Sequence, residues 1–333
     1  MTAHEAVGAN NIPFKSIQAV ILSECNIGAF GVESLAECIG GRNLKDGECK
    51  MIQLNISSNP IGASGCDSIQ KILARPSTGS MVSKLQLAQC NVSDEGITTL
   101  SSAAKNYPCV GLTTLDLSNN SISQDGAKVF AESLLESWPD LAELNLAKND
   151  LGSTGVVMIM QSLLKRNDVE SDHPVISNET IMVMKSLIHH LVIANDNLNS
   201  TLKTLDLTET NCGIEGACAA LMSGGLTSLR LFNNKLGSDG FYSIAKLLRG
   251  GHPTIEHLDV GGNNADEDAV VALLDAIGSI QDGKSRGCAL TVLEIGGNAF
   301  GDDADAALKR LKEVWPMLDV AHDKPVKREV TGE

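Results

Sequence analysis

The sequence predicts a curved α/β solenoid, a horseshoe in which parallel strands line the concave face and helices line the convex face. Three observations support this prediction. A pattern of about 29 residues recurs along most of the 333-residue chain. Each copy opens with two leucine-type residues one residue apart, the alternation of a short strand. Each copy then continues with apolar residues at helical spacing. When a unit of strand, turn, helix and return is repeated, its strands form a parallel sheet.

Nine copies of the pattern can be aligned, and they set the domain organisation. Their first leucine-type positions are residues 20, 54, 85, 115, 144, 205, 229, 258 and 293. We expect residues 1–16 to form an N-terminal cap or flexible lead, residues 17–311 a solenoid of nine or ten repeats, and residues 312–333 a C-terminal cap and tail. The step from 144 to 205 is about two periods. Residues 165–201 are therefore either an insertion that packs an extra helix on the convex side or a disguised repeat.

An asparagine recurs where each strand gives way to a turn, as in Leu144-Asn-Leu146-Ala-Lys-Asn149. Its amide can satisfy backbone groups of the turn and stack from one unit to the next, which predicts an asparagine ladder. The members of this ladder are Asn59, Asn120, Asn149, Asn234, Asn263 and Asn298. Cys25 and Cys90 take the same position in two copies. Thr210 takes it in a third, and this departure predicts an irregular unit.

A glycine follows the asparagine a few residues later in the clearest copies. Gly126, Gly155 and Gly240 precede apolar residues at helical spacing. Because glycine tolerates backbone conformations that other residues avoid, we expect these glycines to permit the tight turn into each helix.

These repeats resemble the leucine-rich repeats of the ribonuclease-inhibitor-like class, which includes Ran GTPase-activating protein, tropomodulin and the repeat domains of innate immune receptors. The resemblance covers residues 17–311, and Cys25 and Cys90 fit it because the class accepts cysteine at the asparagine position. It implies a horseshoe fold that binds proteins.

Composition excludes several classes of protein. The chain carries a net charge of −15, which repels the phosphate backbone and argues against nucleic-acid binding. No apolar run reaches the length of a membrane span, and no secretory signal opens the sequence. Nine cysteines without a C-x-x-C pair indicate reduced thiols. We therefore expect a cytoplasmic protein, with the nucleus not excluded, that exists as a monomer or as a subunit of a larger assembly.

No motif in the sequence predicts an enzyme, a metal site or a cofactor. Residues 278–285 match the phosphate-binding loop pattern, but an apolar helical stretch precedes them and a strand follows, the reverse of the required order. Cys212 and Cys218 flank a turn and are read as small apolar residues in preference to a redox pair.

The outward residue of each strand forms a column on the concave face. The column reads Ile21, Asn55, Gln86, Asp116, Asn145, Asp206, Arg230, Asp259 and Glu294, and from Asp116 onward it contains four acids and one base. Phe232 lies in a flanking column of mostly small residues. The column predicts either a mildly acidic groove for a partner protein or polar cover that any soluble sheet needs.

The sequence therefore favours a non-enzymatic protein-interaction module. Candidate partner-binding residues are Asp116, Asn145, Asp206, Arg230, Phe232, Asp259 and Glu294. Arg230 and Phe232 are the candidate anchors, and the acids favour a basic partner surface. Activation of a small GTPase, as in Ran GTPase-activating protein, is the alternative. That family acts through polar and arginine residues near its N-terminal repeats, whereas the only arginines before residue 160 here, Arg42 and Arg75, lie between repeats. Actin capping, as in tropomodulin, is a third alternative. The disordered N-terminal region with which that family binds actin has no counterpart in residues 1–16.

Overall fold

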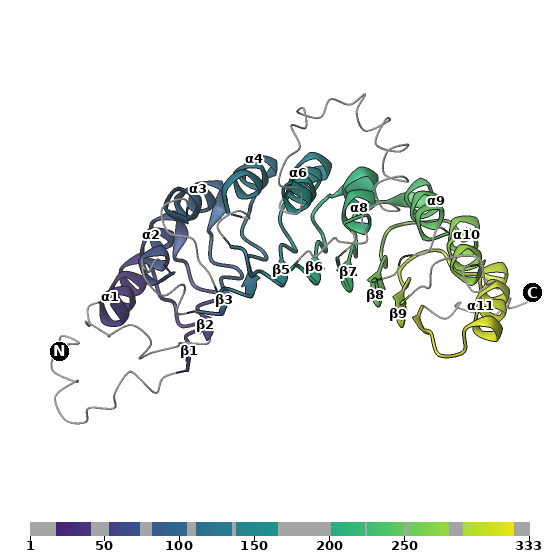
Figure 1. Ribbon diagram of the computed structural model, residues 1–333, viewed down its shortest axis with the longest axis horizontal. Helices are drawn as coiled ribbons and strands as arrows, with labels where there is room; N and C mark the ends of the chain where they lie inside the picture. The colour runs from purple at the N-terminus through teal and green to yellow at the C-terminus, as the bar shows by residue number, and fades with distance from the viewer. Residues whose placement is uncertain are drawn as a thin grey trace, which may run out of the picture.

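The protein is a curved arc with strands on its inner side and helices on its outer side, as Figure 1 shows for the computed structural model. The structure describes residues 18–40, 53–73, 82–104, 111–134, 138–165, 201–223, 225–249, 252, 254–279 and 289–322. The ranges 1–17, 166–200 and 323–333 lie outside this described part, and with them most of the expected cap, insertion and tail.

Ten parallel strands form one sheet in sequence order. They are β1 (Ala19–Ile21), β2 (Gln53–Asn55), β3 (Lys84–Gln86), β4 (Thr114–Asp116), β5 (Glu143–Asn145), β6 (Thr204–Asp206), β7 (Ser228–Arg230), β8 (His257–Asp259), β9 (Val292–Glu294) and β10 (Asp319–Ala321). The predicted α/β horseshoe is confirmed. β10 follows the nine aligned copies and pairs with β9.

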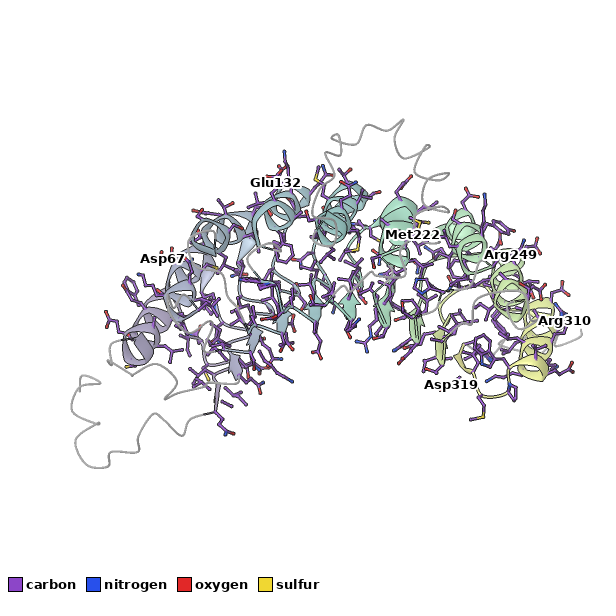
Figure 2. The ribbon with its side chains drawn as sticks, in the orientation of Figure 1. Asp67, Glu132, Met222, Arg249, Arg310 and Asp319 are labelled. Carbon is purple, nitrogen blue, oxygen red and sulfur yellow. The ribbon has the colours of Figure 1, made fainter. Side chains whose placement is uncertain are left out.

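A helix follows each of the first nine strands within the described ranges. These helices are α1 (Ala29–Gly40), α2 (Gly62–Leu73), α3 (Ser93–Ala104), α4 (Gln124–Val129) with its π-helical continuation η2 (Phe130–Leu134), α6 (Gly152–Lys165), α8 (Gly213–Leu221), α9 (Gly237–Leu248), α10 (Glu267–Gly278) and α11 (Asp302–Val314). Charged side chains such as Asp67, Glu132 and Arg310 project from this outer layer (Figure 2).

The sheet runs without a break past the long stretch between α6 and β6. Leu144 of β5 is the direct register partner of Leu205 of β6, and α6 packs against α8. The sheet therefore has no place for a further strand between β5 and β6. This pairing excludes a disguised repeat within the sheet, while the expected extra helix lies outside the described residues.

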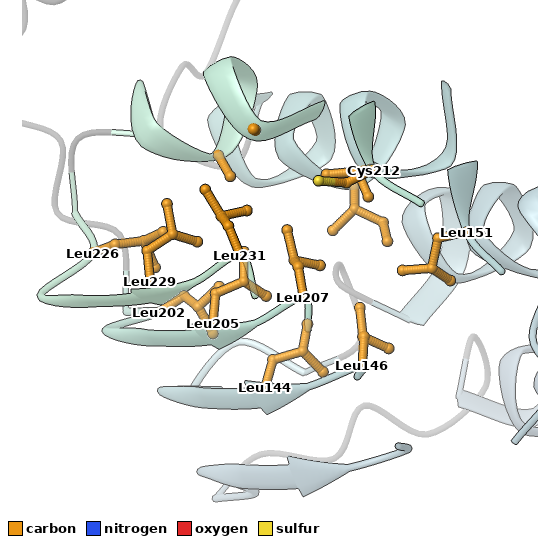
Figure 3. Close-up of a cluster of buried hydrophobic side chains, with 14 of the residues drawn as sticks. Leu144, Leu146, Leu151, Leu202, Leu205, Leu207, Cys212, Leu226, Leu229 and Leu231 are labelled. Atoms are coloured by element: carbon orange, nitrogen blue, oxygen red, sulfur yellow. The ribbon is translucent and has the colours of Figure 1, made fainter. Parts of the chain in front are cut away.

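The core fills the space between the sheet and the helices with aliphatic side chains (Figure 3). The two leucines of each strand unit point inward, so that Leu205, Leu207, Leu229 and Leu231 are all fully buried. Neighbouring units cover these leucines from both sides. Because one unit cannot bury its own apolar face, the stacking of units supplies the stability of the fold.

Asparagine side chains join consecutive units at the turn after each strand. Asn263 Oδ1 accepts hydrogen bonds from the backbone N–H groups of Asn234 (2.7 Å) and Leu236 (3.4 Å) in the preceding unit. Asn263 Nδ2 donates to the Leu231 carbonyl of that unit at 2.9 Å, and the Asn263 N–H donates to Asn298 Oδ1 at 3.1 Å. Asn120 and Asn149 are linked in the same way.

The turn at Thr210 keeps the backbone shape of the other turns, but among the described residues its side chain makes no hydrogen bond to the preceding unit, as the ladder asparagines do. The expected irregularity of this unit thus concerns the ladder and not the backbone. The neighbours of Thr210, Glu209 and Asn211, both have φ of 55°, against 54° and 55° for Gln89 and Asn91. The Thr210 hydroxyl donates to the Leu207 carbonyl at 2.8 Å, as the asparagine amide does elsewhere. One hydroxyl donor is sufficient to hold this turn.

The predicted role of Gly126, Gly155 and Gly240 is also wrong, because all three lie buried inside helices. A Cβ at Gly155 would stand 2.8 Å from Ala127 Cβ on the neighbouring α4. The glycine therefore permits close packing of adjacent helices. The tight turns into α6 and α9 instead use Gly152 and Gly237, with φ of +64° and +61°.

Asn263→Ala is expected to lower the free energy of unfolding by about 2–4 kcal/mol, because it leaves two buried N–H groups of the preceding unit without their acceptor. Chemical denaturation measures the change. Exposed Lys128→Ala on α4 is the control and should change stability by less than about 0.5 kcal/mol. Equal effects of the two variants would contradict a stabilising asparagine ladder.

Gly155→Ala is expected to destabilise the protein by about 1–3 kcal/mol, because the added methyl group cannot fit against Ala127. Gly278→Ala is the matched control, since a Cβ there meets only Leu311 Cδ1 at 3.6 Å. This control should be neutral or stabilising, by up to about 1 kcal/mol. Thermal unfolding compares the two variants. A neutral Gly155→Ala would contradict a tight contact between α6 and α4 at this glycine.

Candidate functional site

Six of the predicted partner-binding residues form one continuous row across the concave face. Asp116, Asn145, Asp206, Arg230, Asp259 and Glu294 are consecutive register partners from β4 to β9. Phe232 follows β7 and is 39% exposed. The structure therefore brings these residues together, because parallel strands in register align equivalent repeat positions.

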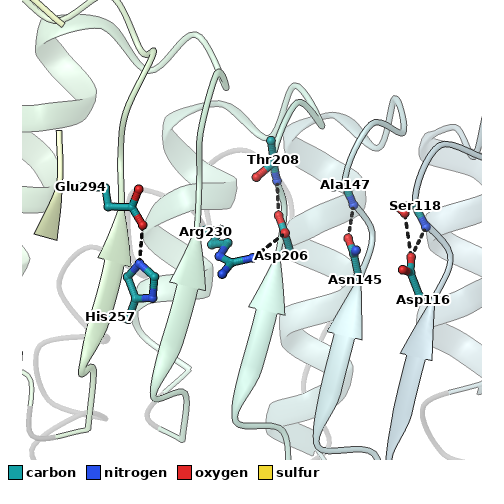
Figure 4. Close-up of polar contacts among 9 residues, drawn as sticks. All are labelled: Asp116, Ser118, Asn145, Ala147, Asp206, Thr208, Arg230, His257 and Glu294. Carbon is teal, nitrogen blue, oxygen red and sulfur yellow. Dashed lines mark hydrogen bonds and ion pairs between the residues drawn. The ribbon is translucent and has the colours of Figure 1, made fainter. Parts of the chain in front are cut away.

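Several acids and amides of this row also hold the turn that follows their strand (Figure 4). Asp116 Oδ1 accepts hydrogen bonds from the Ser118 N–H at 2.9 Å and the Ser118 hydroxyl at 2.7 Å. Asn145 and Asp206 accept in the same way from the N–H groups of residues 147 and 208. A carboxylate or amide at this position thus has a structural role that the sequence reasoning missed.

One ion pair and one histidine–carboxylate contact lie at the C-terminal end of the row. The Asp206 Oδ2 atom is 3.6 Å from Arg230 Nη1, and the Arg230 side chain stays 49% exposed. Glu294 Oε1 is 2.7 Å from His257 Nε2. His257 was not among the predicted site residues, although its place two residues before Asp259 puts both side chains on one face of β8. We call Asp206, Arg230, Phe232, His257, Asp259 and Glu294 the concave patch.

Asp259 is the most buried charged residue of the concave patch, with 8% of its surface exposed. Its Oδ1 atom accepts a hydrogen bond from the Gly261 N–H at 2.9 Å. Burial raises the pKa of the Asp259 carboxyl, and the nearby Glu294 carboxylate raises it further, while the Gly261 hydrogen bond, His257 and Arg230 oppose the rise. The charged form of Asp259 is therefore less favourable than that of a fully exposed aspartate.

Phe232 lies over a floor of glycine backbone. A Cβ placed on Gly261 would stand 2.9 Å from Phe232 Cδ2, and one on Gly262 would stand 3.0 Å from Phe232 Cζ. Any side chain at these two positions would collide with the ring. The glycines thus leave the phenyl ring a flat resting place, and its outer face remains open to solvent.

The described residues show neither a metal-binding group nor a membrane-spanning helix. No group of three or more His, Cys, Asp or Glu side chains in the described ranges could hold a metal ion. No helix in that part of the chain is long and apolar enough to cross a membrane. Burial raises the pKa of the Cys212 thiol to about 12, so it lacks the thiolate that redox exchange requires.

The phosphate-loop pattern has the order of elements expected from the sequence. Helix α10 ends at Gly278 and strand β9 begins at Val292, so the pattern follows a helix and precedes a strand. A phosphate-binding loop requires the opposite order. Residues 280–285 of the pattern lie outside the described residues.

Comparison with known proteins finds the same repeat. The Leucine Rich repeat family matches residues 48–69, 80–101, 112–131, 139–160 and 226–245. Ribonuclease inhibitor from Sus scrofa is 25% identical over 315 residues, which cover 92% of this chain and 64% of that protein. The NACHT, LRR and PYD domains-containing protein 3 of Bos taurus is 24% identical over 302 residues, covering 91% of this chain and 22% of that protein.

The chain thus spans less than two thirds of the length of these relatives. Among solved structures, an internalin from Listeria monocytogenes aligns with a TM-score of 0.39 and 12% identity, over 93% of this chain and 83% of that one. The ten-strand parallel sheet, the repeat matches and the similarity to ribonuclease inhibitor agree with one another. The chain therefore contains leucine-rich repeats, and it is similar to ribonuclease inhibitor over most of its length.

Proposed function

We propose that this chain is a non-enzymatic, cytoplasmic interaction module that binds another protein through the concave patch. Leucine-rich-repeat proteins are generally protein-interaction modules, and curved solenoids present extended inner surfaces for this purpose. The observation that carries the proposal is that Arg230, the last residue of β7, and Phe232, two residues further on, are both exposed on the concave side. Aromatic and arginine side chains in the centre of an interface account for most of its binding energy.

A basic surface is the partner chemistry that best suits the concave patch. The patch contains three acids against Arg230 and His257, and the whole chain carries a net charge of −15. Complementary charge speeds association and selects among partners. The porcine relative is named as a ribonuclease inhibitor, so a ribonuclease is the first purified protein to test.

The proposal predicts that Phe232→Ala/Arg230→Glu loses a partner captured from cell lysate by the native protein. Mass spectrometry identifies the retained proteins, and a purified complex gives the affinity. We expect binding to weaken by about a hundredfold, because two central anchors are removed. The melting temperature should stay within about 2 °C, since both side chains are exposed and Arg230 makes only a long surface ion pair.

The matched control is Tyr242→Ala/Arg249→Glu. Tyr242 on α9 is 44% exposed, and Arg249 ends the same helix on the convex side (Figure 2). This variant removes one aromatic and inverts one arginine, as the test variant does, but on the opposite face. Retention of the same partners by both variants would contradict the proposal and direct attention away from the concave face.

Activation of a small GTPase is the alternative function, and the same preparations test it. An activator accelerates GTP hydrolysis when present in substoichiometric amounts, whereas a binding module forms a complex without turnover. We expect no acceleration, because Arg230, the arginine on the described concave face, is paired with Asp206. Catalytic acceleration that disappears in the Arg230 variant would favour the alternative.

A further inference from the structure

A buried histidine lies in the turn that leads from α9 into β8. His252 is 8% exposed, and both of its ring nitrogens are bonded to backbone groups. Nε2 lies 2.6 Å from the carbonyl oxygen of Leu221, the last residue of α8, and Nδ1 accepts the Ile255 N–H at 3.2 Å. The ring therefore fastens the turn before β8 to the end of α8, the helix that follows β6.

These two bonds require a neutral ring in one tautomer. A carbonyl oxygen only accepts, so Nε2 carries the proton, and the Ile255 N–H only donates, so Nδ1 is unprotonated. A protonated ring would carry hydrogens on both nitrogens, and its Nδ1–H would face the Ile255 N–H. Because Ile255 is 1% exposed, its N–H would lose this acceptor in a buried position, which is costly.

The corresponding turn before β5 does not use a titratable group for this bond. The sequence has a Trp138-Pro pair there, where the turn before β8 has His252-Pro. The N–H three residues on, that of Leu141, donates to the Trp138 backbone carbonyl at 3.4 Å. Its counterpart, the Ile255 N–H, donates to a ring nitrogen. The capacity of that nitrogen to accept depends on pH.

Burial has the largest effect on the protonation of this ring. The titratable residues on the surrounding segments are Cys218 on α8, Lys203 before β6, Arg249 at the end of α9 and Glu256 before β8. The last three are exposed, and no ion pair in the described part of the chain joins them to the ring. Burial lowers the pKa of His252 from 6.5, its ordinary value, and the ring's backbone hydrogen bond opposes the shift.

We propose that His252 is an acid-sensitive latch, which holds the turn before β8 to the end of α8 while its ring is neutral and releases that turn when the ring takes up a proton. The latch does not depend on the binding role of the concave patch. It bears on that surface, because Ile255 lies two residues before β8, and β8 carries His257 and Asp259. Opening of the latch frees the residues that lead into this strand.

The direction of the pKa shift sets the direction of the pH effect. A histidine whose pKa is lowered in the folded state stabilises the closed latch while the ring is neutral. This contribution is fully present above the pKa of the open state, about 6.5, and is lost as the pH falls through it toward the folded pKa. Within that window the equilibrium constant for opening rises by up to about tenfold for each pH unit. The latch is therefore closed at neutral pH, and acid opens it.

Amide hydrogen exchange of the native protein at about pH 7 and about pH 5.5 tests the latch. The protection factor corrects for the intrinsic effect of pH on exchange and so reports opening. We expect the protection factor of the Ile255 amide to fall several-fold, and at most about tenfold, between these values. The Leu141 amide is the internal control, because its acceptor does not titrate. It should keep its protection within about twofold.

His252→Gln is the matched variant, because a glutamine amide keeps a donor for the Leu221 carbonyl and takes up no proton in this range. Its Ile255 amide should lose no protection on acidification. His257→Gln removes a second histidine of the same region and should keep the acid-dependent loss. The latch is wrong if the native Ile255 amide stays protected at the lower pH, or if His252→Gln loses protection as the native protein does.

The ring itself supplies a measurement that needs no variant. Nitrogen chemical shifts of the His252 imidazole identify the protonated nitrogen and the midpoint of its titration. We expect a proton on Nε2 at neutral pH and a midpoint below 6.5. A proton on Nδ1 at neutral pH, or a midpoint at or above 6.5, overturns the latch even if His252→Gln does not fold.

Discussion

The hydrogen bonds of the asparagine ladder are the constraint on which the rest of this structure depends. Each asparagine amide reaches from its own turn into the preceding unit, as Asn263 does toward Asn234 and Leu231. These bonds keep the three-residue strands in register although each strand is too short to be stable alone. The register in turn places the leucines of adjacent units in contact and leaves the last residue of each strand on the concave face.

That register explains why one row of residues serves two purposes. Asp116 and Asn145 use an oxygen to hold the next turn, and their strands carry little other charge on this face. Toward β9, the same row adds Arg230 and Glu294, and His257 beside the row bonds Glu294. The small turn residues there become glycines that support Phe232. The repeat therefore builds a uniform frame, and the side chains that depart from it, most of them between β6 and β9, define the concave patch.

Periodicity predicted the fold class, the strand positions and the inward leucines, because one-dimensional spacing determines which face a strand residue occupies. It did not predict the functions of Gly155 and Thr210. The glycine matters through a contact with Ala127 on the neighbouring helix, and the threonine replaces one donor of the missing amide; both effects depend on distances between units. Strand β10 was missed because Asp319-Val-Ala321 lacks the leucine pattern, and the His257–Glu294 pair joins residues 37 positions apart.

The most direct test of the whole account is hydrogen–deuterium exchange of the chain with and without its captured partner. Amides of the turns after β6 to β9 should gain protection on binding, while the convex helices α6 to α10 should exchange as they do in the free protein. Protection confined to the helices, with the turns of the concave patch unchanged, would contradict the claim that the repeat frame exists to present this face.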